Sequence, residues 1–103
     1  MLTNAPPVVL TCSWERFSDS GKIAANGLPF NPQAMCCASR MWPIGTVLKV
    51  TDAHNGCSVT VRVTDKISEH YANRLDLSPA AFSYLNGLPK GICTATVTVV
   101  KSQ

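Results

Sequence analysis

Four stretches of this chain alternate between apolar and polar residues with a period of two, and this pattern limits the possible folds most strongly. The stretches are residues 8–14, 46–51, 57–64 and 93–99. A period of two is typical of β-strands that bury one face and expose the other. Short strands with little helix to cover them leave bare edges unless the sheet closes on itself. The pattern therefore predicts a mainly β chain folded as a small closed barrel.

One short helix is the second clear element. Ser78 is a suitable N-cap residue, Pro79 is tolerated in the first helical turn, and Asn86-Gly87 is typical of a left-handed stop. We therefore expect a helix over about residues 78–85. A shorter helical turn is expected over residues 31–37, where a Pro follows an Asn.

Two connections between these elements have distinct compositions. Asn55-Gly56 lies between two expected strands, and this pair tolerates the positive φ of a tight hairpin. The residues from 15 to 31 are rich in Gly, Ser and Asn, which predicts a long loop of the kind that often builds sites in small domains. We expect one domain over residues 1–103, with residues 1–7 as a flexible N-terminal extension.

Composition excludes several classes of protein. The chain is 46% hydrophobic and only 15% charged, which excludes a disordered chain. Its formal charge of +3 comes from scattered basic residues, so nucleic acid is not an expected partner. A mild positive charge suits an anionic surface such as a cell wall. No apolar run approaches the ~20 residues that span a bilayer, so no transmembrane segment is expected.

Five cysteines in so small a domain favour an oxidising compartment. The first residues lack the basic and apolar regions of a signal peptide, so we expect a removed leader or another export route. The expected location is secreted, periplasmic or attached to the cell wall. Cys12 and Cys93 fall on apolar faces of the first and last expected strands. We predict at least one disulfide, using Cys93, and the full pairing stays open. Neither His lies at ligand spacing from a Cys, so we expect no metal site and no cofactor.

Four segments, taken in order, carry a family resemblance. They are Thr11-Cys12-Ser13-Trp14, residues 24–31, residues 43–51, and residues 55–65 followed by Leu75-Asp76-Leu77-Ser78. In this order and spacing they resemble the double-psi β-barrel of the rare lipoprotein A family, over about residues 11–100. The resemblance implies a six-stranded barrel with one or two short helices and a groove that binds an extended glycan. Expansins, barwin-like proteins and a group of inverting endoglucanases share this fold.

The resemblance implies a domain that acts on cell-wall glycan, and we expect it to cleave peptidoglycan strands. Cleavage would follow the chemistry of a lytic transglycosylase or of a glycoside hydrolase. Two alternatives stay open. One is a non-catalytic polysaccharide-binding module like the expansins, and the other is a secreted inhibitor or effector that contacts a protein through its loops. The expected partner is a polysaccharide, above all peptidoglycan, and the expected state is a monomer.

The resemblance places Asp76 at the position of the family's general acid. Its apolar neighbours Leu75 and Leu77 favour a carboxyl that keeps its proton near neutral pH. The alternative is that Asp76 only stabilises the start of the helix that follows. Asp65 matches a second family Asp, which either orients Asp76 or caps a loop amide.

A hydrolase needs a second carboxylate as base, about 6.5–9.5 Å from the acid in inverting enzymes. Glu15 is the candidate, because it follows Trp14 where the related endoglucanases place a catalytic Asp. The alternative is a solvated Glu at the end of a strand. A lytic transglycosylase does not need this second group, since a hydroxyl of the sugar itself attacks.

The sugar-binding candidates lie in expected loops and are Trp42, Ser39, Tyr71 and Asn26. Trp42 and Tyr71 could stack on sugar rings. Asn26 lies in one of the segments that match the family, and Ser39 stands where the family has the His of an Ala-Ala-His motif. His70 could replace that His, or could be an exposed loop residue.

Overall fold

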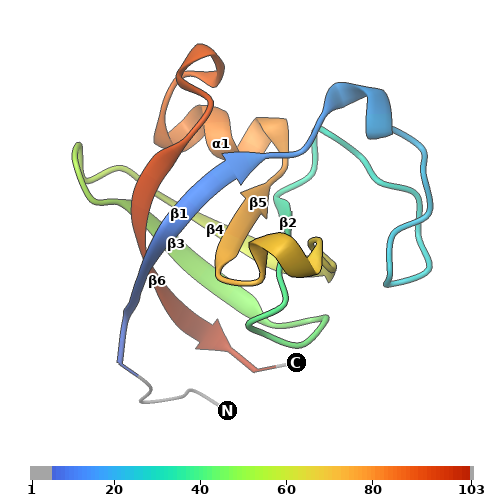
Figure 1. Ribbon diagram of the computed structural model, residues 1–103, viewed down its shortest axis with the longest axis horizontal. Coiled ribbons are helices and arrows are strands. Elements are labelled where there is room, and N and C mark those ends of the chain that lie inside the picture. The colour runs from blue at the N-terminus through green and yellow to red at the C-terminus, as the bar shows by residue number, and fades with distance from the viewer. Residues whose placement is uncertain (1–5, 103) are drawn as a thin grey trace.

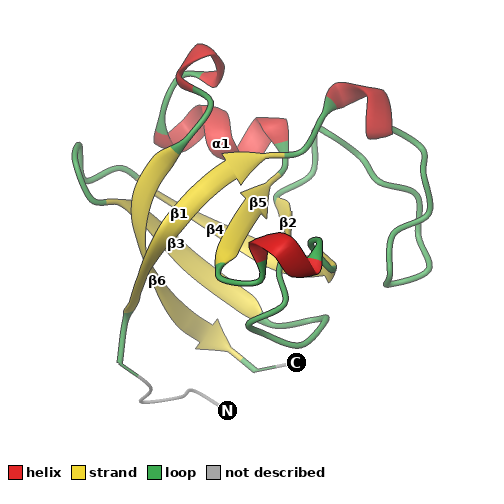
Figure 2. Ribbon diagram, in the orientation of Figure 1, coloured by secondary structure: helices red, strands yellow, loops and turns green. Residues whose placement is uncertain are grey.

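Six β-strands close into a barrel in the computed structural model, which describes residues 6–102 (Figures 1 and 2). The strands are β1 (Val8–Trp14), β2 (Cys36–Ala38), β3 (Val47–Asp52), β4 (Ser58–Asp65), β5 (Arg74–Leu77) and β6 (Cys93–Lys101). Around the barrel their order is β1-β5-β2-β4-β3-β6. β1 runs parallel to β5 and β2 parallel to β4, whereas the other neighbours are antiparallel. The predicted six-stranded barrel is confirmed; residues 1–5 of the predicted extension lie outside the described residues.

Four strands coincide with the alternating stretches of the sequence to within two residues: β1, β3, β4 and β6. β2 and β5 have only three and four residues, too few for alternation to mark them. All three residues of β2 are buried, so no polar face marks it either. The predicted turn over residues 31–37 is right only in its first part. The backbone N of Ala34 donates to the carbonyl oxygen of Asn31 at 3.0 Å, whereas Cys36 and Cys37 pair with β4 and Cys37 also pairs with β5.

The helix α1 (Pro79–Leu85) lies where the sequence predicts it. The Oγ of Ser78 accepts a hydrogen bond from the backbone N of Ala81 at 3.2 Å, which caps the first turn. The end of the helix differs from the prediction. Asn86 is extended with φ −159° and Gly87 has φ −70°, so neither residue forms the expected left-handed stop. Three single 3-10 turns complete the described helical elements: η1 (Phe17–Asp19), η2 (Glu69–Tyr71) and η3 (Leu88–Lys90).

A buried carboxylate joins the turn between β3 and β4 to the end of α1. The Oδ1 of Asp52 accepts hydrogen bonds from the backbone N of His54 at 2.7 Å and of Asn55 at 3.2 Å. Its Oδ2 accepts from the side-chain Nδ2 of Asn86 at 2.8 Å. Burial acts to raise the pKa of Asp52, but these hydrogen bonds outweigh burial and lower the pKa. Gly56 in the same turn has φ +78°, as the Asn-Gly pair predicts.

The long loop between β1 and β2 spans residues 15–35 and stands away from the barrel (Figure 1). It folds back on itself, since Ile23 and Pro29 form an isolated antiparallel bridge. Gly27 turns the chain between them with φ +85°, a conformation that favours glycine. The predicted loop is therefore present and has local structure of its own.

The core fills the barrel and continues to the inner face of α1. Its largest fully buried side chains are Phe82, Leu48, Leu75, Leu77, Leu85, Val50, Val61, Val63 and Val97. The helix covers the end of the barrel at which β1 and β5 finish (Figure 1). Trp14 is half-buried against this core, and its Nε1 donates to the carbonyl oxygen of Leu88 at 3.1 Å. No helix among residues 6–102 is long and apolar enough to cross a membrane.

Phe82 joins the helix to the barrel core, so its truncation tests this packing. We expect Phe82→Ala to lower the free energy of unfolding by about 3–5 kcal/mol, because it leaves a cavity. The matched control on the same helix is Tyr84→Ala, where the side chain is 65% exposed and the expected change is within about 0.5 kcal/mol. Urea unfolding followed by circular dichroism measures both. Equal losses in the two variants would contradict this account of the core.

The five cysteines all lie among the described residues, and all five are free thiols in this structure. Cys12 and Cys93 are nevertheless direct partners in the antiparallel β1–β6 register. Cys12 is fully buried, and Cys93 is half-buried. The structure thus brings together the two residues that the sequence analysis singled out, and a bridge between them stays a prediction.

We expect oxidation to join Cys12 to Cys93. A bridge over so long a loop contributes about 3–5 kcal/mol to stability where it forms without strain. Mass spectrometry of denatured, unreduced protein should show the loss of two hydrogens, and Cys93→Ser should abolish that loss. Cys57→Ser is the control, because Cys57 is exposed. Five free thiols in protein purified under oxidising conditions would show that the bridge does not form.

Candidate functional site

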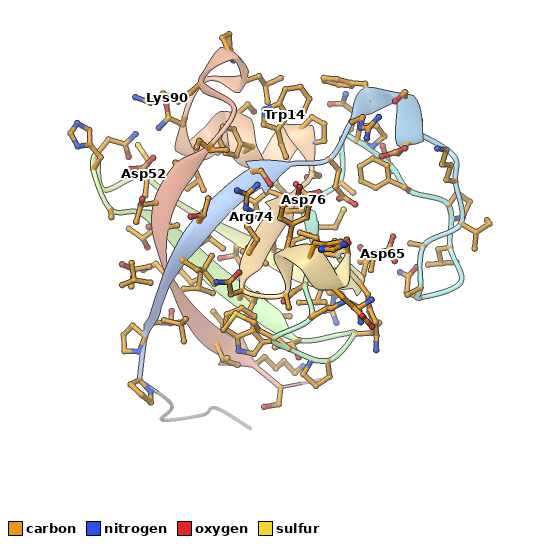
Figure 3. The ribbon with its side chains drawn as sticks, viewed as in Figure 1. Trp14, Asp52, Asp65, Arg74, Asp76 and Lys90 are labelled. Carbon is orange, nitrogen blue, oxygen red and sulfur yellow. The ribbon has the colours of Figure 1, made fainter. Side chains whose placement is uncertain are left out.

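The ends of β1 and β5 form one side of a cleft with a volume of about 600 Å³ (Figure 3). The parallel register places Ser13 opposite Asp76, and the backbone N of Glu15 donates to the carbonyl oxygen of Leu77 at 2.7 Å. Four acids line the cleft: Glu15, Asp19, Asp65 and Asp76. Three basic residues also line it: Arg16, Lys66 and Arg74. The cleft therefore gathers all three predicted catalytic carboxyls.

Asp76 is half-buried in this cleft and is held by one clear hydrogen bond. The Oγ of Ser13 donates to its Oδ1 at 2.8 Å. Burial raises the pKa of Asp76, although the Ser13 hydrogen bond and the charge of Arg74 oppose the rise. A carboxyl whose pKa is raised in an open cleft is suited to donate a proton to a bound molecule.

Glu15 has a stronger tendency to hold its proton. Burial, followed by the charges of Asp76, Asp65 and Asp19, raises its pKa to about 8. Its Oε2 is buried and has no hydrogen-bond partner among the described residues. Glu15 is therefore not the solvated strand-end residue of the alternative interpretation, and it is mainly neutral at pH 7.

Asp65 has a clear structural role. Its Oδ1 accepts hydrogen bonds from the backbone N of Ala25 and of Lys66, both at 2.9 Å. These bonds fasten the long loop to the end of β4. Of the two roles considered for Asp65, the geometry favours capping of a loop amide, since the side-chain bond to Asp76 comes from Ser13.

Only one of the predicted sugar-binding residues reaches the cleft. Tyr71 lines it from η2, and the guanidinium of Arg74 lies over its ring at 4.8 Å. Trp42 and Ser39 line a different hollow, and Ser39 is 1% exposed with its Oγ accepting a hydrogen bond from Met41 N at 3.0 Å.

Asn26 lies in a third hollow, on the long loop. Its Oδ1 accepts a hydrogen bond from the backbone N of Leu28 at 3.0 Å, so it holds the turn of that loop. The sequence analysis considered His70 as a possible replacement for the family His that is absent at Ser39. His70 is exposed and lines a hollow beside the cleft.

The sequence analysis missed Ser13 and Arg74, which both belong to the cleft. A signal was available for each. Ser13 comes two residues before Glu15, and Arg74 two residues before Asp76, so each shares a strand face with a predicted carboxyl. Among residues 6–102 no group of three or more His, Cys, Asp or Glu side chains is arranged to hold a metal ion.

The sequence of this chain matches one family of known proteins. The sequence model of the lytic transglycolase family matches residues 10–99. A probable endolytic peptidoglycan transglycosylase of Nostoc sp. is 36% identical over 81 residues, which is 79% of this chain and 22% of that protein. The endolytic peptidoglycan transglycosylase of Campylobacter jejuni is 35% identical over 89 residues, 85% of this chain and 32% of its own length. The chain therefore spans less than a third of the length of these relatives.

Solved structures share the fold. The Streptomyces papain inhibitor superposes with a TM-score of 0.76 at 24% identity, over 93% of this chain and 96% of the inhibitor. The expansin of Clavibacter michiganensis superposes with a TM-score of 0.73 at 24% identity, over 95% of this chain and 52% of the expansin. At identities this low, the likeness shows a shared barrel fold and gives no evidence of a shared function.

The raised pKa of Glu15 makes stability depend on pH. Between its ordinary pKa of 4.5 and about 8 the folded chain binds the proton more tightly than the unfolded chain, so stability falls as pH rises through this window. We expect Glu15→Gln to be more stable than the wild type at pH 9, by an amount on the order of 1–3 kcal/mol, and similar to it at pH 4. Urea unfolding at both pH values measures this. Glu69→Gln, at an exposed position, is the control, and a Glu15→Gln curve parallel to the wild type would contradict the assignment.

Proposed function

Because this chain belongs to the lytic transglycolase family of double-psi β-barrels, we propose that it cleaves the glycan strands of peptidoglycan, with Asp76 as general acid. One observation carries the proposal: the Asp76 carboxyl lies in an open cleft, half-buried, with its pKa raised and its orientation fixed by Ser13. The relatives named as peptidoglycan transglycosylases support the choice of substrate. A polymer of the cell wall also implies action outside the cytoplasm, in the periplasm or at the wall.

The reaction begins when Asp76 gives its proton to the oxygen that links two sugars. The bond to that oxygen breaks as positive charge develops on the sugar, and the ionised carboxylate that remains stabilises this charge. A hydroxyl of the same sugar then attacks the reacting carbon and returns a proton to Asp76. The products are a new chain end and an anhydro-sugar end, and no water is consumed.

The state of Glu15 favours this route over hydrolysis. A hydrolase needs an ionised carboxylate to remove a proton from the attacking water. Glu15 keeps its own proton to about pH 8, so it is a poor base at neutral pH. The remaining groups support the substrate: Asp65 fixes the loop beside the cleft, and Tyr71 offers a ring against which a sugar can pack.

A second candidate function, binding to another protein, has one observation in its favour. Two apolar side chains of the long loop are strongly exposed, Ile23 at 68% and Leu28 at 62%. Neither residue lines the cleft, although the same loop begins with Glu15 and is bonded to Asp65 through Ala25. Replacement of both residues by Ser should leave glycan cleavage unchanged, whereas it should abolish any inhibitor function. The expansin-like alternative has less support, because Trp14 and Tyr71 are the only aromatic residues of the described chain that line the cleft.

Asp76→Asn tests the proposed acid. The substitution keeps the shape of the side chain but removes the proton donor, so cleavage of purified peptidoglycan should fall by about 10²–10⁴-fold while binding persists. Glu69→Gln is the control, because Glu69 is exposed and does not line the cleft. Release of soluble fragments is the measurement. Equal activity of the wild type and Asp76→Asn would contradict catalysis by Asp76.

The chemistry of the product ends separates the two mechanisms. A transglycosylase yields anhydro-sugar ends and should tolerate Glu15→Gln, since the neutral amide resembles the neutral acid present at pH 7. A hydrolase yields reducing ends and should lose activity in that variant. We expect anhydro ends from both the wild type and Glu15→Gln by mass spectrometry of the fragments. Reducing ends that disappear in Glu15→Gln would show that the protein is a hydrolase.

A further inference from the structure

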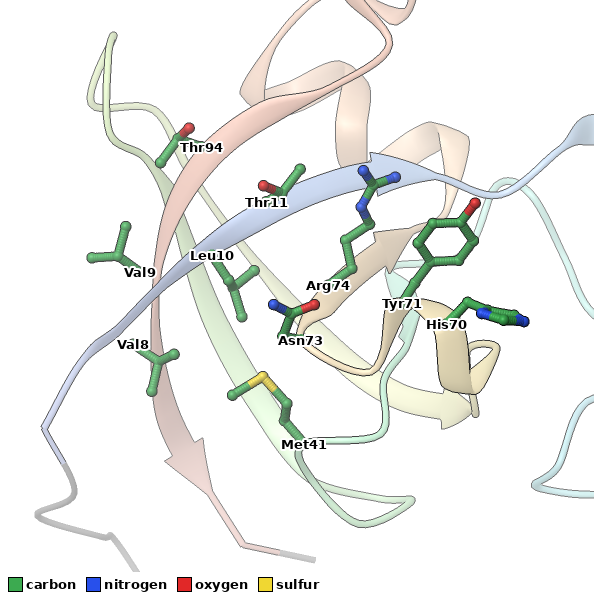
Figure 4. Close-up of a pocket in the computed structure, with 10 residues that line it drawn as sticks. All are labelled: Val8, Val9, Leu10, Thr11, Met41, His70, Tyr71, Asn73, Arg74 and Thr94. Atoms are coloured by element: carbon green, nitrogen blue, oxygen red, sulfur yellow. The ribbon is translucent and has the colours of Figure 1, made fainter.

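A second hollow, with a volume of about 590 Å³, adjoins the catalytic cleft on the outer side of β1 and β5 (Figure 4). The two cavities share Tyr71 and Arg74. Four acids line the catalytic cleft, whereas no carboxylic acid lines the second hollow. Arg74 therefore lies at the boundary between the part of the groove that holds the carboxyls and a part that has none.

The side chain of Arg74 is held in place by its neighbours. Arg74 comes two residues before Asp76 on β5, so both side chains project from the same outer face of the barrel. Its guanidinium lies over the ring of Tyr71 at 4.8 Å, a cation–π arrangement that Figure 4 shows in close-up. This contact holds the guanidinium beside the ring of Tyr71.

The N–H groups of the Arg74 guanidinium have no partner within the described part of the chain. Arg40 and Arg62 each donate to a backbone carbonyl, whereas Arg74 makes no hydrogen bond or ion pair with any of residues 6–102. Arg74 is nevertheless half-buried. A guanidinium presents its donors in a fixed fork that fits the two oxygens of a carboxylate. A half-buried fork with free donors is a preorganised site for such a group.

We propose that Arg74, stacked on Tyr71, is a specificity-determining residue that binds a carboxylate of the glycan beside the bond that is cut. This inference rests on the proposed function and names a chemical requirement of its substrate. Peptidoglycan supplies carboxylates from two sources. One is the lactyl group of muramic acid, whose carboxylate is free only where the stem peptide has been removed, and the other is the stem peptide itself. Chitin has the same linkage between acetylated sugars but no carboxylate, so it separates recognition of the charge from recognition of the sugar.

The test compares three glycans: peptidoglycan strands freed of stem peptides, strands that keep them, and chitin oligosaccharides. We expect Arg74→Gln to weaken binding to carboxylated strands, and to raise the KM for them, by about 10- to 100-fold, the range for lost charge-assisted hydrogen bonds. Binding of chitin and kcat should change little. The strand type that shows the loss identifies the source of the carboxylate. Lys49→Gln is the control for net charge, because Lys49 is exposed on β3 and away from both cavities.

Two further variants separate recognition from other effects. Tyr71→Ala removes the ring that holds Arg74 and that a sugar can pack against, so it should weaken binding of carboxylated strands more than binding of chitin, whereas Tyr71→Phe should retain both. If Arg74 only tunes Asp76 through its charge, Arg74→Gln will shift the pH profile for every glycan alike and will leave discrimination unchanged. That result, or an equal loss on chitin, would overturn the subsite.

The proposed function and the subsite fail in different ways. Cleavage by the wild type with unchanged discrimination in Arg74→Gln would overturn the subsite alone. Absence of cleavage would overturn the proposed function, and calorimetric binding of carboxylated strands against chitin would still test Arg74. Equal affinity for the two glycans, or no affinity for either, would overturn the subsite in that case.

Discussion

The parallel pairing of β1 with β5 is the constraint on which the site depends. In this register Ser13 lies opposite Asp76, and Glu15 continues the pairing past the end of β1. Side chains alternate along a strand, so a slip of one residue would turn the carboxyls inward and bring Leu75 and Leu77 to the surface. The barrel core buries both leucines completely. The packing of the core and the placement of the carboxyls are therefore fixed by the same register.

The two carboxyls differ because their surroundings differ. Burial raises the pKa of Asp76, and the hydrogen bond from Ser13 and the charge of Arg74 limit this rise. Glu15 has an oxygen with no partner among the described residues, and the charges that act on it most are those of other acids. Such an arrangement opposes folding at neutral and alkaline pH, and the apolar core has to offset it. The burial and the acidic neighbours that oppose folding also keep Glu15 neutral beside Asp76.

Local patterns predicted much of the fold but only part of the site. Alternation marked the four longer strands, and the Ser78 cap marked the helix, because these signals act within a few neighbouring residues. β2 and β5 escaped detection since their identity depends on partners far along the chain. The carboxyls and Tyr71 meet in the cleft as expected, whereas Trp42, Ser39 and Asn26 do not reach it. Ser13 and Arg74 each lie two residues before a predicted carboxyl, but the register of β1 against β5 was needed to show that Ser13 lies opposite Asp76.

The Asp52 carboxylate couples the local opening of two segments of the domain. It binds two amides of the β3–β4 turn with one oxygen and Asn86 at the end of α1 with the other, so neither segment can open without losing part of a shared set of bonds. The turn and the helix terminus should open together as one cooperative unit in amide hydrogen exchange. When the pH falls through the lowered pKa of Asp52, these hydrogen bonds would be lost first. The amides of the paired strands would stay protected from exchange for longer. The β3–β4 turn and the end of α1 would then exchange amide hydrogens faster, while Phe82 keeps the helix packed against the barrel.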